Sequence, residues 1–334
     1  MRTLVISDLH IGAGHGRAAL EDQTIVEPLA AAIAGYDRLV LLGDVIELRQ
    51  GPIQDALAAA SRVLPQLVSG LGRGGEVIML AGNHDHQLQV HPEATAQIES
   101  MLSGSGASVR FEYPGVWLRG DVYAQHGHYL DRHTTTPAFE RVAAGVMARF
   151  LKLPFSAMKE ENDYERLLAP IYAWMFAISQ TSAREIDAAD GGGSARALKL
   201  IRESSGVRRL AVQAGLRSVL GTANLARVGP LSPDLSPPAL RRSSLIAFGE
   251  VLSVLNLQPR YAIFGHSHRA GPLPGDDRSE WIVGDGIELV NSGCWVHESA
   301  DFMSEEPSDN PYRPGFAVEL GDAGPPRLVN LLDG

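Results

Sequence analysis

The sequence predicts a layered α/β fold that is interrupted by a long helical insertion. Short apolar runs alternate with helical patterns through the first third of the chain. Between about residues 137 and 256 the patterns are helical, and strand-like runs return after residue 260. A chain of 334 residues is long enough for one large domain or two modest ones. We therefore expect a core formed by residues 1–133 and 244–334, with residues 134–243 as a helical insertion that could form a cap.

Apolar runs in the first third of the chain predict buried strands. They are TLVISD at residues 3–8, RLVLLGD at 38–44 and EVIMLAGNHD at 76–85. Near-continuous apolar runs of this length suit strands that are buried on both faces of a sheet. Ala-rich segments at 27–34 and 55–71 predict the connecting helices, which gives a β-α-β-α-β order. Two further runs, at 108–120 and 121–128, predict antiparallel strands.

The middle of the chain predicts amphipathic helices. Apolar residues between Phe139 and Leu151 follow the i, i+3, i+4, i+7 spacing of one helix face. Similar patterns lie at residues 164–180, 195–203 and 207–220, and strand-like runs return at 260–268, 281–295 and 315–320.

The apolar stripe of residues 139–151 has two interpretations. It could belong to a cap that favours a lipid-like substrate, or it could form the insertion's own core or a dimer contact. Amphipathic helices usually bury their stripe internally, which favours the second interpretation.

Composition and charge narrow the class of protein. The formal net charge of −10 argues against a dedicated nucleic-acid binder, which normally presents a basic face. Cys294 is the only cysteine, so no intramolecular disulfide can form, and a cytoplasmic location fits best. No signal-peptide pattern precedes the first strand, and the longest apolar stretch, residues 167–178, is shorter than the roughly 20 residues of a spanning helix. We expect a cytoplasmic protein without a transmembrane segment.

Each strong strand pattern ends in residues that can bind a metal ion. The clusters are Asp-Leu-His at 8–10, Gly-Asp at 43–44, Gly-Asn-His-Asp at 82–85, His-Gly-His at 126–128 and Gly-His-Ser-His at 265–268. In α/β sheets, ligands bind in the crevice beyond the carboxyl ends of the strands, so the five clusters could converge on one site. A single short motif of this kind is weak evidence, because most such motifs are only turns or caps. The prediction of a metal site depends on all five occurring in order.

The donor types in these clusters restrict the metal and the chemistry. Asp, His and Asn side chains without thiolates suit Mn²⁺, Fe or Zn²⁺. There are enough donors for two ions, and a carboxylate such as Asp44 can bridge them. Two metal ions about 3.5–4 Å apart are a known arrangement for phosphoryl transfer. The sequence therefore points to a two-metal site acting on a phosphoester.

The ordered set of five clusters resembles the signature of the calcineurin-like metallophosphoesterase family. The resemblance covers residues 1–133 and 244–334, including LVNSGCW at 289–295, and leaves out the helical insertion. It implies a four-layer α/β/β/α sandwich with a two-metal site at one edge. It also implies hydrolysis of a phosphomonoester or phosphodiester by a metal-activated hydroxide, with two divalent ions, foremost Mn²⁺ and otherwise Fe, Zn²⁺ or Mg²⁺.

The resemblance also implies a role for each site residue. Seven residues would bind the ions: Asp8, His10 and His268 the first, Asp44 both, and Asn83, His126 and His266 the second. His84 would contact the substrate phosphate together with Asn83 and would protonate the leaving group, while Asp85 would orient the His84 imidazole. Independently of the resemblance, Arg269 directly follows the last ligand and could hold a substrate phosphate through two hydrogen bonds, or be an ordinary surface arginine.

The substrate is expected to be a small-molecule or lipid-like phosphoester, and the chain could form a homo-oligomer. SDLHIG, GDVIE and the helical insertion resemble the UDP-diacylglucosamine pyrophosphohydrolase branch of the family. That branch has arginine where His84 stands, whereas GNHD is the general phosphodiesterase and phosphatase form. The alternatives are a phosphoprotein or nucleic-acid phosphoesterase and a non-catalytic scaffold. A scaffold would be expected to lose ligands, and none is missing here.

Overall fold

The computed structural model describes residues 1–14, 16–71, 74–154, 158–181, 206–297 and 310–333. The chain divides into two compact units. The first comprises Met1–His128, Met175–Asp187 and Pro259–Gly334, and the second comprises Tyr129–Trp174 and Ala188–Gln258. All ten predicted site residues lie in the first unit.

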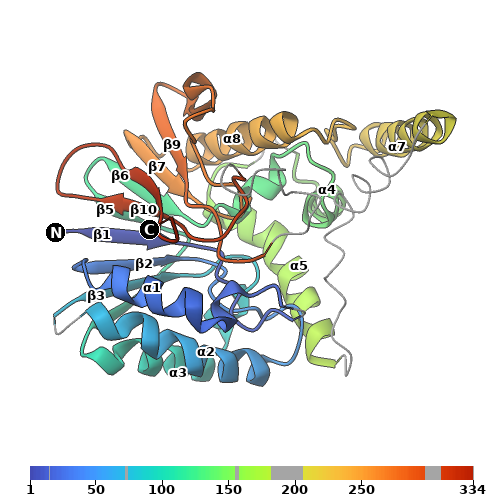
Figure 1. Cartoon of the computed structure of the whole chain (residues 1–334). Coiled ribbons are helices and arrows are strands. Elements are labelled where there is room, and N and C mark those ends of the chain that lie inside the picture. The colour runs from blue at the N-terminus through green and yellow to red at the C-terminus, as the bar shows by residue number, and fades with distance from the viewer. Residues whose placement is uncertain (15, 72–73, 155–157, 182–205, 298–309, 334) are drawn as a thin grey trace. The chain divides into compact units, whose positions relative to one another are not determined.

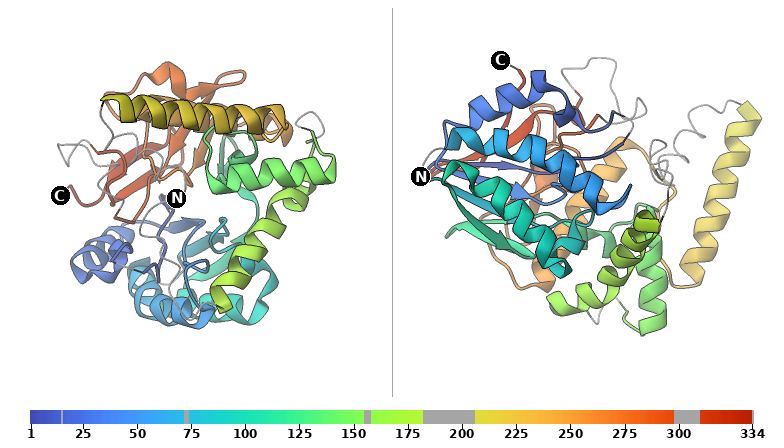
Figure 2. Two further views of the ribbon diagram at one scale, coloured as in Figure 1. Left: turned by 90° about the vertical axis from the view of Figure 1, so that its right-hand side faces the viewer. Right: turned by 90° about the horizontal axis from the view of Figure 1, so that it is seen from below.

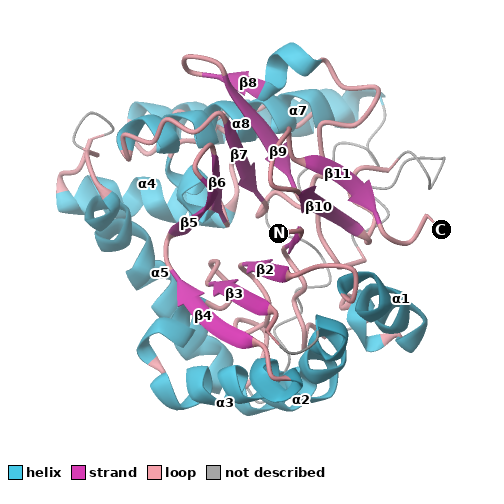
Figure 3. Ribbon diagram, turned by 90° about the vertical axis from the view of Figure 1, so that its left-hand side faces the viewer, coloured by secondary structure: helices cyan, strands magenta, loops and turns pink. Residues whose placement is uncertain are grey.

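The first unit contains a six-stranded sheet in the order β11-β10-β1-β2-β3-β4. Four of its strands run parallel: β1 (Thr3–Ile6), β2 (Arg38–Leu42), β3 (Glu76–Leu80) and β4 (Ser108–Glu112). Strand β10 (Phe316–Leu320) pairs antiparallel with β1, and β11 (Arg327–Asn330) pairs antiparallel with β10. One face is covered by helices α1 (Gln23–Ile33), α2 (Ile53–Val68) and α3 (Pro92–Leu102), as Figures 1 and 3 show.

The second sheet has the strand order β5-β6-β7-β9-β8. Its strands are β5 (Gly115–Arg119), β6 (Val122–Gln125), β7 (Tyr261–Phe264), β8 (Ile282–Val283) and β9 (Ile287–Asn291). The strand predicted at 108–120 therefore divides between the two sheets, because β4 joins the first and β5 pairs with β6 in the second. The division falls at Tyr113 and Pro114. Because proline has no N–H to donate to a neighbouring strand, the ladder of β4 does not continue through it.

An apolar layer separates the two sheets, and it follows from the two-residue period of the strands. Val5, Val40 and Ile78 face the second sheet, whereas their neighbours Leu4, Leu39 and Val77 pack with the helices. Strands buried on both faces explain the near-continuous apolar runs of the sequence. The expected α/β sandwich, with two sheets and flanking helices, is thereby confirmed.

Truncation of one side chain in this layer is expected to cost much of the stability. Ile78 is fully buried between the sheets, so Ile78→Ala leaves a cavity and lowers the free energy of unfolding by about 2–5 kcal/mol. Val90→Ala, at an exposed position of the same unit, changes it by less than about 0.5 kcal/mol. Chemical denaturation measures the free energy of unfolding of both variants. Equal losses in the two would contradict the burial of Ile78 between the sheets.

In the described part of the second unit, the regular elements are helical. They are α4 (Phe139–Leu151), the first residues of α5 (Glu161–Thr181), α7 (Gly206–Leu225) and α8 (Pro237–Val254). This agrees with the helical patterns read from the sequence, and the one at 195–203 lies outside the described residues. Gly145 of α4 packs against the backbone of Val228, with no room for a Cβ. Among the described residues, no helix has both the length and the apolar character that crossing a bilayer requires.

Candidate metal centre

The five polar clusters follow the carboxyl ends of β1, β2, β3, β6 and β7, and main-chain hydrogen bonds join two pairs of them. The Asp8 N–H donates to the Gly43 carbonyl over 3.1 Å, and the His10 N–H donates to the Asp44 carbonyl over 2.9 Å. On the second sheet, the Gly265 N–H donates to the His126 carbonyl over 2.9 Å. Clusters that are far apart in the sequence are therefore held in fixed register by main-chain hydrogen bonds.

The loops that carry the clusters have unusual backbone conformations. Five of the seven predicted ligands have positive φ: Asp8 (55°), His10 (44°), Asp44 (51°), His266 (64°) and His268 (58°). Such values are uncommon outside glycine and cost local strain, which folded proteins retain mainly at functional sites. The glycines of the motifs allow close approach, since a Cβ on Gly43 (φ 90°) would lie 2.5 Å from the His126 ring, and one on Gly82 would collide with the Asp44 carboxylate.

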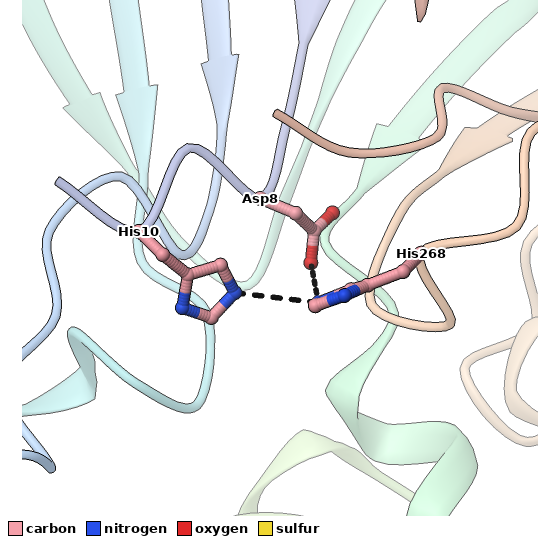
Figure 4. A group of neighbouring side chains, drawn as sticks. All are labelled: Asp8, His10 and His268. Atoms are coloured by element: carbon pink, nitrogen blue, oxygen red, sulfur yellow. Dashed lines mark hydrogen bonds and ion pairs between the residues drawn. The ribbon is translucent and has the colours of Figure 1, made fainter. Parts of the chain in front are cut away.

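The first group of side chains that could hold an ion consists of Asp8, His10 and His268, which point toward one another in Figure 4. His268 Nε2 lies 3.2 Å from Asp8 Oδ1 and 3.3 Å from His10 Nε2. Asp8 Oδ1 is buried and receives no hydrogen bond among the described residues. A carboxylate oxygen and two ring nitrogens that converge in this way are a donor set that suits a divalent cation.

The second group consists of Asp44, His126 and His266, with Asn83 beside them. His126 Nδ1 donates to the Leu42 carbonyl over 2.9 Å, which leaves Nε2, 3.2 Å from Asp44 Oδ2, as the ring nitrogen that could bind an ion. The side-chain amide of Asn83 contacts His266 Nδ1 at 3.0 Å. In one orientation of this amide the oxygen faces His266 Nδ1 and His126 Nε2, and in the other it accepts a hydrogen bond from Arg49 Nη1.

Asp44 lies between these two groups. Its Oδ2 atom is 3.7 Å from His10 Nε2 and 3.2 Å from His126 Nε2. Asp44 and His10 also form a third group with His84, whose possible ligand atoms all lie within 4.8 Å of one another. One buried carboxylate thus faces ligands of both groups, which is the position that a bridging ligand requires.

Glu47 is a site residue that the sequence-based reasoning missed. Its carboxylate is buried and lies 2.9 Å from His10 Nδ1 and 2.7 Å from His84 Nδ1. It thereby orients both imidazoles and leaves their Nε2 atoms toward the cluster. The available signal was an acidic residue among the apolar residues Val45, Ile46 and Leu48.

The expected role of Asp85 needs correction, because its carboxylate does not bond to the His84 ring. It accepts hydrogen bonds from the backbone N–H groups of Gly82 and Val45, each over 2.7 Å, and of Asp44 over 3.2 Å. Asp85 therefore ties the loop after β3 to the loop after β2. Adjacency in the sequence was misleading here, since the partner of His84 comes from another loop.

Charge accumulates in the buried cluster. Burial raises the pKa of Asp8, but the neighbouring His126 and His268 outweigh burial and lower that pKa to about 2. Burial likewise raises the pKa of Glu47, yet His84 and His10 hold it well below its usual value. Burial lowers the pKa of His126, and Asp44 and Asp8 overcome this and raise it to about 9. The carboxylates stay ionised at neutral pH and concentrate negative charge that cations can balance.

Two arginines near the clusters differ in their surroundings. The guanidinium of Arg269 pairs with Asp276 over 2.6 Å and lies over the Trp281 ring, 5.5 Å from its centroid. Arg269 belongs to none of the groups above, and its predicted contact with substrate stays a prediction. Arg49 is buried, and its Nη1 atom lies 2.6 Å from the Asn83 amide. The structure thus brings to the cluster an arginine that no motif had indicated.

Comparison with known protein families agrees with the resemblance found in the sequence. A family model described as calcineurin-like phosphoesterase matches residues 1–270 of the chain. No match was found among the curated proteins. The matched segment contains every predicted ligand and continues through the helical second unit.

Proposed function

The chain belongs to the calcineurin-like phosphoesterase family, and from this premise we propose that it is a hydrolase that cleaves a phosphoester with two divalent metal ions. The observation that carries the proposal is the position of Asp44 between two groups of converging donors. Asp8, His10 and His268 would hold one ion, Asn83, His126 and His266 the other, and Asp44 both. We propose Mn²⁺ as the native metal and the cytoplasm as the location.

The proposed mechanism divides the chemistry between the ions and the side chains. When bound, the ions supply Lewis acidity, which acidifies a water molecule and offsets the charge of the phosphate oxygens. Glu47 holds His84 through Nδ1, so His84 Nε2 is the atom that gives a proton to the leaving oxygen. Burial and the charge of Arg49 lower the pKa of His84 against the opposing effect of Glu47, which makes its imidazolium a readier acid.

The proposed substrate is a small-molecule or lipid-like phosphoester. The net charge of −10 disfavours long polyanionic substrates, because these bind through extended basic surfaces. In the proposed site, the positive charge near one phosphate group would come from the two ions, from the His84 imidazolium and from Arg49. A site of this kind fits one phosphate at a time.

Hydrolysis of chromogenic aryl phosphates tests the proposed reaction. The protein, stripped of metal with a chelator, is assayed on a bis-aryl phosphodiester and on the aryl monoester with added Mn²⁺, Mg²⁺ or Zn²⁺. We expect turnover only after metal is restored, fastest with Mn²⁺. Absence of turnover on both esters and on a panel of nucleotides, phospholipids and sugar nucleotides, together with absence of bound metal, would favour a scaffold instead.

Replacing Arg49 is expected to weaken binding of the phosphate group. Arg49→Met removes one charge-assisted hydrogen-bond donor, so KM and the inhibition constant for inorganic phosphate rise by about 10- to 100-fold. Arg269→Met is the matched control, since Asp276 already engages that guanidinium. Steady-state kinetics and metal content are measured on both variants. A larger effect at Arg269 than at Arg49 would restore the role that the sequence suggested for Arg269.

A further inference from the structure

Helix α4 presents its largest apolar side chains on the side opposite to its packed face. The packed face consists of Arg141, Ala144, Gly145 and Ala148, all of which are buried. The guanidinium of Arg141 donates to the backbone carbonyls of Thr134 and Val228, so this face is fixed within the second unit. Phe139, Val146 and Phe150 lie on the opposite face, and all three are exposed.

The exposed face of α4 and the neighbouring residues of α5 form an apolar groove of about 430 Å³. Figure 2 shows the two helices side by side. The lining consists entirely of apolar residues: Phe139, Val142, Ala143, Val146, Met147, Phe150, Pro170, Ile171 and Trp174. Phe139 and Trp174 stack with their ring centroids 6.2 Å apart. The stripe that the sequence predicted at 139–151 is therefore not the internal core of the described part of this unit.

The exposed area of this groove is large enough for an interface between two chains. Phe139 is 43% exposed, Trp174 56% and Phe150 79%. With roughly 150–250 Å² per aromatic side chain, these rings present on the order of 350 Å² of apolar surface per chain. Two copies would bury on the order of 700 Å² from the rings, and Val146 and Met147 add to this, so the contact approaches the roughly 1,000 Å² that a specific interface needs.

The groove is also complementary to itself. A two-fold interface pairs the same patch on both chains, so the patch must contain both a projection and a recess. Phe150 lines the groove and is 79% exposed, so its ring is open to a second copy. A cavity of roughly 150 Å³ already holds one benzene ring. The recess of about 430 Å³ has room for the Phe150 ring of a second copy.

We propose that the chain self-associates as a two-fold dimer through the α4–α5 groove, with Phe150 and Trp174 at its centre. A negatively charged lipid surface is the less favoured partner, because the chain carries a net charge of −10. The dimer contact lies within the second unit and does not depend on the proposed reaction.

Sedimentation velocity of the full-length protein over a range of concentrations tests this proposal. The wild type is expected to be dimeric at micromolar concentration. Phe150→Glu and Trp174→Glu each place two buried charges in the symmetric interface, so each raises the dimer dissociation constant by at least about 100-fold. Ile246→Glu on α8 is the matched control, because Ile246 is an exposed apolar residue of the same unit outside the groove. It is expected to leave the dissociation constant unchanged.

Three results would overturn the dimer. They are a wild type that stays monomeric throughout, Glu variants that dimerise as tightly as the wild type, and an Ile246→Glu variant that dissociates as the groove variants do. Thermal unfolding verifies that each variant is folded. Co-sedimentation of a monomeric wild type with vesicles of phosphatidylcholine and phosphatidylglycerol, lost in Phe150→Glu, would assign the groove to a membrane surface instead.

Discussion

The Asp44→Asn variant is expected to lose bound metal and turnover together. Asp44 Oδ2 faces ligands of both groups, so a neutral amide weakens both ion sites at once. Two ions contribute several kcal/mol of transition-state stabilisation, and kcat/KM is therefore expected to fall by roughly 10³-fold or more. Elemental analysis of the dialysed protein and steady-state kinetics measure the two effects on one preparation.

The control for this variant is Asp285→Asn, which removes a carboxylate of an exposed residue. It is expected to keep the metal content and the rate of the wild type. Full activity of Asp44→Asn with normal metal content would contradict the proposal that Asp44 binds both ions.

The His84→Asn variant is expected to separate catalysis from metal binding. Seven other residues supply the proposed ligands, so the metal content stays close to that of the wild type. Loss of a general acid lowers kcat by about 10²- to 10⁴-fold. The loss of kcat is expected to be smaller for an aryl ester, whose leaving group needs no proton, than for an alkyl ester. Paired assays on the two esters measure the difference.

Two further variants test which carboxylate orients His84. Glu47→Gln keeps the imidazole but removes the carboxylate that lies 2.7 Å from its Nδ1, so an intermediate loss of kcat is expected. Asp85→Asn replaces one of the two carboxylate oxygens that accept from four backbone N–H groups, so it is expected to lower thermal stability. A Glu47→Gln variant with wild-type kcat would return the orienting role to Asp85.

The first three strands of the first sheet could be predicted from the sequence because apolar runs and the polar residues that end them are local properties. Runs such as residues 38–44 are apolar on both faces and stop at a polar cluster, and the parallel strands then bring their clusters to one edge. The division of residues 108–120 between two sheets was not predicted. It depends on long-range pairing of β5 with β6, which a continuous apolar run does not reveal.

Motif residues that the sequence singled out converge in the structure, whereas the residues that support them were not identified from the sequence. Asp85 and Arg269 were chosen for their position next to His84 and His268 in the sequence. Their side chains bond to backbone amides and to Asp276, while Glu47, from another loop, bonds to His84. Neighbouring residues in a tight loop point in different directions. The hydrogen-bonding partner of a side chain such as His84 can therefore be identified only from the folded structure.

The most direct test of the two-metal site is a titration of the metal-free protein with Mn²⁺, in which bound metal and turnover are followed together. We predict that binding saturates at two ions per chain and that turnover reaches its maximum only when the second ion is bound. Full turnover with one bound ion, or in the metal-free protein, would contradict the two-metal account.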